Sequence, residues 1–280
     1  MSTSTTQDGP LVGKTALVTG ASRGVGRAIA QRLAAAGSTV IISARNLAQS
    51  QASSGSLAET ASLIESAGGI AIPLAADLDE PQGAKQLVAC CIRATGGFQI
   101  LVHVAGLTRF RAAESSTRDQ FGLTVEHCFR VPLTLTAAAK PVMKARSEGW
   151  IINVGATASP DLNRCADPLR QIREQALYDA AHLALFRLTK AMAAELEHHN
   201  IAVNLALPST PIRLTDEQPL GDAATLTEPV DYLADTVLSL CHVPVQQRTG
   251  TVIYSQQDQT TNRSGVFRTH RFGRNSPLPA

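Results

Sequence analysis

Residues 14–33 read KTALVTGASRGVGRAIAQRL and predict a strand, a glycine-rich turn and a helix in immediate succession. The apolar residues 16–18 are typical of a short buried strand. Apolar side chains then recur at four-residue spacing, as on one face of a helix: Val25, Ile29 and Leu33. The turn holds three glycines: Gly20, Gly24 and Gly26. Glycine permits a sharp turn and close approach of a ligand, and the N–H groups that start the next helix attract phosphate. The stretch therefore predicts a pyrophosphate-binding turn.

The spacing of these glycines, Gly-x3-Gly-x-Gly, differs from the Gly-x-Gly-x-x-Gly of the general dinucleotide fingerprint. With its flanking residues the turn reads TGASRGVG over residues 19–26, and it closely resembles the signature of the short-chain dehydrogenase/reductase family. The resemblance extends from about Leu11 to Ser255. It implies that six residues of the turn contact a nicotinamide cofactor: Gly20, Ser22, Arg23, Gly24, Val25 and Gly26.

The composition is that of an ordinary globular protein, with 44% hydrophobic and 17% charged residues in a chain of 280. A net charge of +2 argues against a dedicated nucleic-acid binder, and no apolar run reaches the length of about 18 residues that a membrane span needs. The start, MSTSTTQDGP, lacks the regions of a signal peptide, so we expect a flexible end. Five cysteines without a CxxC pair predict neither a metal site nor a disulfide framework, and they fit a reducing cytoplasm.

Strand and helix patterns alternate along the chain, which predicts right-handed βαβ units and a parallel sheet with helices on both faces. We expect a single doubly wound, Rossmann-like α/β domain over residues 11–255, with an insertion at 158–176 and a substrate lid at 209–229. The seven strands of the sheet are expected at residues 16–18, 39–43, 70–75, 99–104, 150–154, 201–207 and 250–254. A flexible segment at 1–10 and a tail at 256–280 would flank this domain. The basic tail is expected to be solvated, with an arm over its own site or a neighbouring subunit as the alternative.

The residues after the second strand predict which cofactor is bound. An NAD-specific site would carry an acid there, whereas this chain has Ala44, Arg45 and Asn46. Arg45, together with Arg23 in the glycine turn, would instead complement the 2′-phosphate of NADP(H), because a guanidinium pairs with phosphate in a bidentate way. The alternative is that both arginines are solvated surface charges.

The resemblance implies further cofactor contacts at the ends of later strands. Asp77, with Leu78 beside it, stands where the family places an acid against the adenine, although Asp77 could simply cap the next helix. The turn at 103–106 reads HVAG, which resembles the family's Asn-Asn-Ala-Gly with both asparagines replaced and leaves Ala105 and Gly106 as contacts. Pro208 begins a Pro-Ser-Thr-Pro segment where the family has Pro-Gly.

The catalytic positions depart from the family pattern. Tyr178 matches the Tyr of the family's Tyr-x-x-x-Lys motif, but the lysine is His182, four residues on and therefore on the same helical face. Ala156 aligns with the family's serine, so the nearest hydroxyls belong to Thr157 and Ser159. Cys128 stands at the family's asparagine, next to His127.

These departures leave three hypotheses open. In the first, Tyr178 is the acid of an NADP(H)-dependent carbonyl reductase, His182 holds the ribose, and Thr157 or Ser159 replaces the serine. In the second, Tyr178 works with His182 or His127 as acid and base in dehydration, isomerisation or cyclisation, without net redox chemistry. In the third, the chain is a catalytically silent subunit that binds NADP(H). A neutral histidine supplies less positive field than lysine, which argues for the second, whereas the intact turn and Arg45 favour the first.

The resemblance also implies partners. The substrate is expected to be a small molecule, and neither nucleic acid nor a membrane is expected to bind. Members of the family commonly pair through the two long helices that residues 121–143 and 178–197 match here, so we expect a homo-oligomer.

Overall fold

The computed structural model describes residues 9–48, 55–104, 115–156, 176–210, 212–213 and 227–255. Its centre is a parallel sheet of seven strands in the order β3-β2-β1-β4-β5-β6-β9. The strands are β1 Thr15–Thr19, β2 Thr39–Ala44, β3 Ile70–Ala75, β4 Ile100–His103, β5 Gly149–Val154, β6 Ile201–Leu207 and β9 Val252–Tyr254. The predicted single doubly wound domain with a seven-stranded parallel sheet is therefore confirmed, and each expected strand lies within a few residues of its predicted place.

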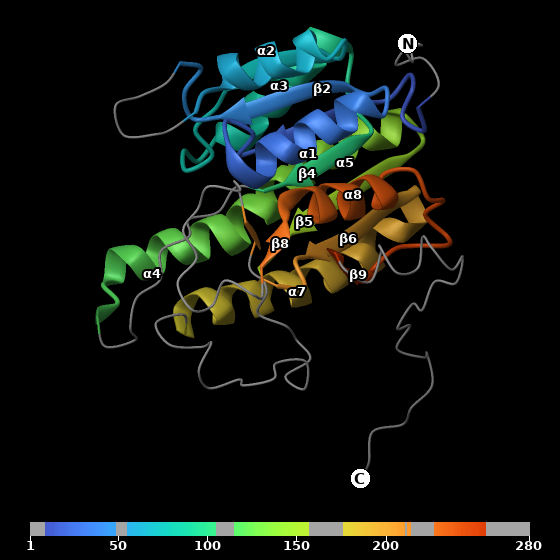
Figure 1. The fold of residues 1–280 in the computed structure, drawn as a ribbon. Coiled ribbons are helices and arrows are strands. Elements are labelled where there is room, and N and C mark those ends of the chain that lie inside the picture. The colour runs from blue at the N-terminus through green and yellow to red at the C-terminus, as the bar shows by residue number, and fades with distance from the viewer. Residues whose placement is uncertain are drawn as a thin grey trace.

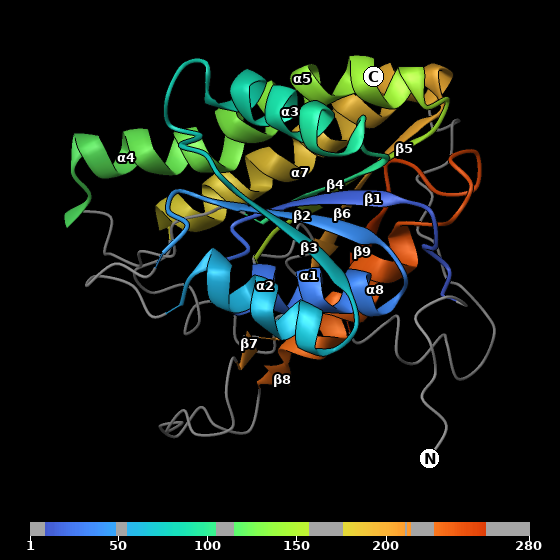
Figure 2. The same cartoon turned by 90° about the horizontal axis from the view of Figure 1, so that it is seen from above.

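Helices cover both faces of this sheet, as Figures 1 and 2 show. One layer contains α1 Gly24–Ala35, α2 Leu57–Ser66 and α8 Val230–Leu240. The opposite layer contains α3 Gly83–Thr95, α5 Val131–Ala145 and α7 Ala176–Leu196, which ends in the short turn η5 Glu197–His199. Two large apolar clusters fill the space between the sheet and the two layers. Central strands such as β4 and β6 are buried along their whole length, as expected for a parallel sheet covered on both faces.

The helix predicted at residues 121–143 differs from expectation. It begins earlier, as α4 Arg118–Val125, and it continues through a π-helical segment, η3 Glu126–Arg130, into α5 without leaving helical backbone angles. Such single-turn π segments are rare and occur frequently at functional sites. The resemblance to the family implied the helix but carried no sign of the π-helical segment in its middle.

The predicted lid region contains a small second sheet. The two-residue strands β7 Ile212–Arg213 and β8 Glu228–Pro229 pair in parallel, with Ile212 opposite Glu228 and Arg213 opposite Pro229. The intervening part of the predicted lid lies outside the described residues, as do most of the predicted insertion and the predicted tail.

The strand order indicates where along the sheet a ligand would bind, at the carboxyl ends of its strands. β1 pairs with β2 on one side and with β4 on the other, so the chain reverses its direction of winding between β1 and β4. Ligands of open α/β sheets bind outside the carboxyl ends of strands at such a point. The residues that follow each strand at this edge are therefore the candidates for a site.

Candidate active site

The glycine-rich turn has the backbone shape that its sequence predicted. Gly20 and Gly24 adopt φ values of 65° and 56°, which L side chains rarely take up. A Cβ on Gly26 would lie 2.3 Å from the carbonyl oxygen of Gly20, so only glycine lets α1 start so close to the end of β1. The N–H groups of the first turn of α1 thus lie where an anionic ligand can be bound.

The two predicted phosphate-binding arginines come from neighbouring strands. Ala21 donates its N–H to the carbonyl of Ser43 at 3.1 Å, which continues the pairing of β1 with β2 beyond their ends. Arg23 and Arg45 each follow this junction by two residues, and both side chains are exposed. Both arginines therefore follow the carboxyl ends of the paired strands β1 and β2, and their side chains lie on the surface.

The loop after β3 holds the predicted adenine contacts, and it also holds His127. The Asp77 carboxylate accepts the N–H of Asp79 at 3.0 Å, which makes Asp77 part of a loop turn and leaves Gln82 as the N-cap of α3. The carbonyls of Leu78 and Asp79 accept hydrogen bonds from Arg130 at 3.0 and 3.2 Å. The π-helical segment is thereby fastened to this loop.

His127 is turned toward the same loop. Its Nε2 lies 3.3 Å from Asp79 Oδ1, and its side chain is only 12% exposed. The ring of His127 therefore lies against the loop after β3, and its role as an acid or base beside Tyr178 stays a prediction. The residue after it, Cys128, lies near enough to Tyr178 to influence its pKa.

His103, at the end of β4, is held between two neighbouring elements. Its ring is 2% exposed, with Nδ1 3.4 Å from the Thr19 hydroxyl and Nε2 3.4 Å from the carbonyl oxygen of His127. A carbonyl can only accept, so the ring proton is on Nε2, and Nδ1 shares the Thr19 hydroxyl proton with the carbonyl oxygen of Val102, 3.5 Å from that hydroxyl. Burial lowers the pKa of His103 to about 4, which keeps the ring neutral. His103 therefore joins the strand before the glycine turn to the π-helical segment.

Tyr178 and His182 lie together at the start of α7, as their four-residue spacing predicted. Their ring centroids are 4.1 Å apart, and His182 Nδ1 lies 2.8 Å from the backbone carbonyl oxygen of Tyr178. The His182 ring faces the end of β5, because a Cβ on Gly155 would lie 3.7 Å from its Cδ2. Asn153 in β5 donates to Thr189 at 2.9 Å and holds α7 against the sheet.

The environment keeps both side chains uncharged at neutral pH. Burial, followed by the nearby Cys128 and Asp179, raises the pKa of Tyr178 to about 12. Burial lowers the pKa of His182 below its ordinary value of 6.5, against the opposing hydrogen bond to the Tyr178 carbonyl. Because that carbonyl requires a proton on Nδ1, His182 presents an unprotonated Nε2, which can accept a hydrogen bond or a proton. A lysine at this position would only donate.

Other predicted positions complete the same edge. Cys128 is 5% exposed, and burial raises the pKa of its thiol to about 11, so it lies near Tyr178 as a neutral group. Ala156 is buried just after β5. Pro208 is buried directly after β6. The remaining predicted residues, Thr157, Ser159, Ala105 and Gly106, lie outside the described residues.

Glu228 in β8 supports this end of the sheet, although no pattern in the sequence pointed to it. Its carboxyl group is 1% exposed and accepts hydrogen bonds from the Ser255 hydroxyl and from the Ser209 N–H, the latter at 3.2 Å. It thereby ties the segment after Pro208 to β8 and to the end of β9. A buried glutamate in a polar stretch has no periodicity that would reveal it.

Comparison with known proteins places this arrangement in a family. Residues 14–216 match the family described as short chain dehydrogenase. A short chain dehydrogenase of Pseudocercospora fijiensis is 34% identical over 191 residues, which are 68% of this chain and 57% of that protein. The L-rhamnose 1-dehydrogenase (NAD(P)(+)) of Azotobacter vinelandii is 30% identical over 213 residues, 76% of this chain and 78% of that enzyme. The chain thus spans a little over half the length of the fungal relative.

The fold has solved counterparts. The crystal structure of a short chain dehydrogenase from Burkholderia cenocepacia, in complex with NADP, superposes with a TM-score of 0.74 at 29% identity. The superposition covers 88% of this chain and 97% of that one. No helix in the parts of the chain that the structure describes has the length and apolar character needed to cross a membrane.

Proposed function

This chain belongs to the short-chain dehydrogenase/reductase family, and we propose that it is an NADP(H)-dependent oxidoreductase that reduces a carbonyl, or oxidises an alcohol, of a small molecule. The observation that carries the proposal is the pairing of Tyr178 and His182 at the end of β5, on the sheet edge that also carries the glycine turn. The NADP-bound relative from Burkholderia cenocepacia supports a nicotinamide cofactor.

The residues at the edge fit such a cofactor. The left-handed glycines and the cradle at Gly26, which a Cβ would fill, suit a phosphate group. Arg23 and Arg45 would pair with a 2′-phosphate, and Asp77 and Leu78 would lie against the adenine. When bound, the nicotinamide supplies or accepts the hydride.

The proton is handled by Tyr178 in this proposal. Its hydroxyl, neutral at all working pH values, donates to the developing oxyanion of a carbonyl. Without the cation that a lysine at residue 182 would supply, tyrosinate formation is costly, and losing one donor to the oxyanion typically costs about 2.7–4 kcal/mol in the transition state. His182 Nε2 would hold the ribose by accepting a hydrogen bond from one of its hydroxyls, but its neutral ring supplies no positive field to the tyrosinate. We therefore expect a slow reductase.

A redox-neutral reaction is the second candidate, favoured by the opposite polarities of the two side chains. Tyr178 is a donor, whereas His182 Nε2 is an acceptor, which suits an acid and a base acting on one substrate. In that case turnover would leave the nicotinamide unchanged.

The first experiment is a fluorescence titration with NADPH and NADH of the wild type, Arg45→Ala and Arg93→Ala. Arg93 is an exposed arginine of α3 and serves as the matched control. We expect Arg45→Ala to weaken NADPH binding by about 10- to 100-fold, since it removes a hydrogen bond to a charged group. NADH binding and the control should not change. Failure of the wild type to bind either nucleotide would exclude the oxidoreductase.

Turnover then separates the remaining candidates. With a panel of carbonyl substrates, NADPH oxidation by the wild type and its loss in Tyr178→Phe, with NADPH binding retained, would support the reductase. Substrate conversion without NADPH oxidation would support the redox-neutral enzyme. Binding without any turnover would leave a silent subunit.

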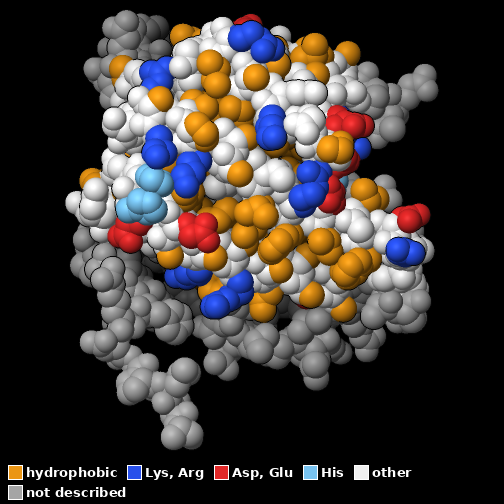
Figure 3. Space-filling model, turned by 180° about the vertical axis from the view of Figure 1, so that it is seen from behind, with side chains coloured by type: hydrophobic (Ala, Val, Ile, Leu, Met, Phe, Trp, Pro, Cys, Tyr) orange, Lys and Arg blue, Asp and Glu red, His pale blue; other side chains and the backbone are white. Residues whose placement is uncertain are grey.

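We also propose a homo-oligomer built on α4, α5 and α7. Large apolar side chains gather on this face, as Figure 3 shows. Exposed members of the group are Phe121, Val125, Phe129, Leu133 and Leu183. Exposed apolar area of this kind is typical of protein contacts. Sedimentation of the wild type and of Phe129→Asp tests this, since the aspartate should shift the assembly toward the monomer and a monomeric wild type would refute it.

A further inference from the structure

Two carbonyl groups of the glycine turn are held by side chains rather than by backbone. The Arg27 guanidinium donates from Nη2 to the carbonyl oxygen of Ser22 at 2.8 Å. The Thr60 hydroxyl, at 0% exposure, lies 2.9 Å from the carbonyl oxygen of Ala21 and 3.1 Å from that of Ser56, so its single proton serves these two acceptors. Thr60 belongs to α2, which is separated from the turn in the sequence by α1 and β2.

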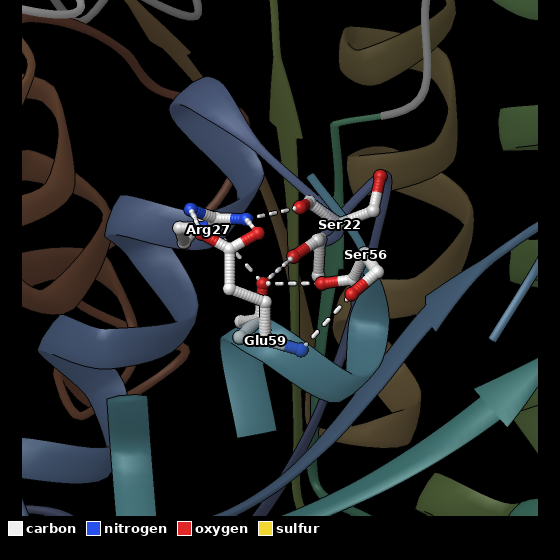
Figure 4. A network of polar contacts seen from close by, with 6 residues as sticks. Ser22, Arg27, Ser56 and Glu59 are labelled. Carbon is white, nitrogen blue, oxygen red and sulfur yellow. Dashed lines mark hydrogen bonds and ion pairs between the residues drawn. The ribbon is translucent and has the colours of Figure 1, made fainter. Parts of the chain in front are cut away.

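Arg27 is itself held in place from α2, as Figure 4 shows. Both of its terminal nitrogens donate to the Glu59 carboxylate at 2.8 Å, and its Nε donates to the Thr60 hydroxyl at 3.1 Å. Ser56 caps the helix by accepting the N–H of Glu59 at 3.0 Å. The first turn of α2 thus acts on the glycine turn both directly and through Arg27.

The close approach of α2 requires a further glycine. A Cβ on Gly55 would lie 2.8 Å from the carbonyl oxygen of Ser22 and from Arg27 Nη2, and its φ is +110°. Only glycine fits there without displacing this contact. The sequence before α2 is therefore matched to the turn that it supports.

These contacts determine which way the N–H groups of the turn point. In a trans peptide the carbonyl of one residue and the N–H of the next point in opposite directions, and the described chain contains no cis peptide. Fastening the carbonyls of Ala21 and Ser22 toward α2 therefore turns the N–H groups of Ser22 and Arg23 away from it. The same contacts keep both carbonyl oxygens, which would repel an anion, away from the side of the turn to which these N–H groups point.

We propose that Thr60 and Arg27 are positioning residues for cofactor binding, with Glu59 orienting Arg27. They hold the Ser22 and Arg23 N–H groups in place for a phosphate group before the cofactor arrives, which reduces the ordering cost of binding. This inference rests on the proposed function, because it requires that the turn bind a phosphate of a nicotinamide nucleotide. The phosphate is either the pyrophosphate, common to NADPH and NADH, or the 2′-phosphate of NADPH.

The test compares Thr60→Val, which keeps the shape and removes the hydroxyl, with Thr60→Ser, which keeps the hydroxyl. Thr236→Val is the matched control, because Thr236 is equally buried and its hydroxyl bonds the carbonyl of Tyr232 within α8. Dissociation constants for NADPH and NADH are measured by fluorescence, together with the thermal unfolding of each protein without nucleotide.

We expect Thr60→Val to raise the dissociation constant about tenfold, as for loss of a buried hydrogen bond, with Thr60→Ser close to the wild type. Arg27→Met should have a similar effect. Equal losses for both nucleotides would identify the pyrophosphate, and a loss for NADPH alone would identify the 2′-phosphate.

Two results would overturn the proposal, and they are distinguishable. If the wild type binds and Thr60→Val binds as tightly as Thr236→Val at equal loss of thermal stability, the contacts are merely structural and the proposed function stands. If the wild type binds neither nucleotide, the proposed function fails and the positioning role fails with it.

Discussion

Replacing His182 with lysine should lower the pKa of Tyr178 by as much as about 3. The centroids of the two rings lie 4.1 Å apart, and an ammonium placed about 4 Å from the Tyr178 hydroxyl would contribute about 4 kcal/mol at an effective dielectric constant near 20. At 1.36 kcal/mol per unit, this lowers the pKa of Tyr178 from about 12 to about 9. Burial also penalises the introduced ammonium, so this shift is an upper value. His182→Met, which is long and uncharged, should leave the pKa unchanged.

The assay is a titration of tyrosinate absorbance in the near ultraviolet. The chain has three tyrosines, so each variant is paired with its Tyr178→Phe counterpart and the difference is taken. In a reductase, the same substitution should raise turnover at neutral pH, because the tyrosinate left by proton donation is stabilised. Superimposable difference titrations of His182→Lys and His182→Met would refute the reasoning, because they would show that charge at residue 182 does not reach the Tyr178 hydroxyl.

Three further outcomes are expected. Acidification from about pH 7 to pH 4 should destabilise the wild type by roughly 3 kcal/mol more than it destabilises His103→Asn, as measured by urea unfolding. The pKa of His103 is about 4 in the folded chain and 6.5 in the unfolded chain, so in this pH window the proton binds mainly to the unfolded chain. Equal losses would show that His103 is not held neutral. A thiol reagent should label the part-exposed Cys90 well before the buried Cys128, whose pKa is raised to about 11, and mass mapping follows the two rates. Equal labelling rates would contradict the described burial of Cys128. Gly26→Ala should lower the free energy of unfolding by about 1–3 kcal/mol, because its Cβ would meet a backbone carbonyl oxygen at 2.3 Å. Gly122→Ala is the control, because a Cβ there would meet nothing within 4 Å, and it should be neutral or stabilising. Both variants are compared with the wild type by thermal unfolding.

Local sequence was enough to predict the fold. The strand–turn–helix of residues 14–33 and the alternation that follows it require only neighbours within a few positions, because hydrophobic periodicity and glycine placement act over one turn or one strand. β6 begins and ends where the apolar run IAVNLAL predicted. The closeness of Tyr178 and His182 also followed from spacing, because residues four apart share a helical face.

The tertiary structure decided how the site is supported and charged. His127 and Cys128 are adjacent, but the π-helical segment sends the first toward Asp79 and places the second near Tyr178. The protonation states of Tyr178 and His182 depend on burial by elements distant in sequence. No pattern in the sequence could assign them.

The sequence by itself therefore determined the seven-stranded sheet, the approximate places of its helices and which residues follow each strand. Only the folded chain decided that α2 holds the glycine turn through Thr60 and Arg27, and that His103 joins β1 to the π-helical segment. The physical reason is range. Periodicity records whether a side chain is buried, whereas a hydrogen bond between Thr60 and Ala21, 39 residues apart, depends on how separate elements pack.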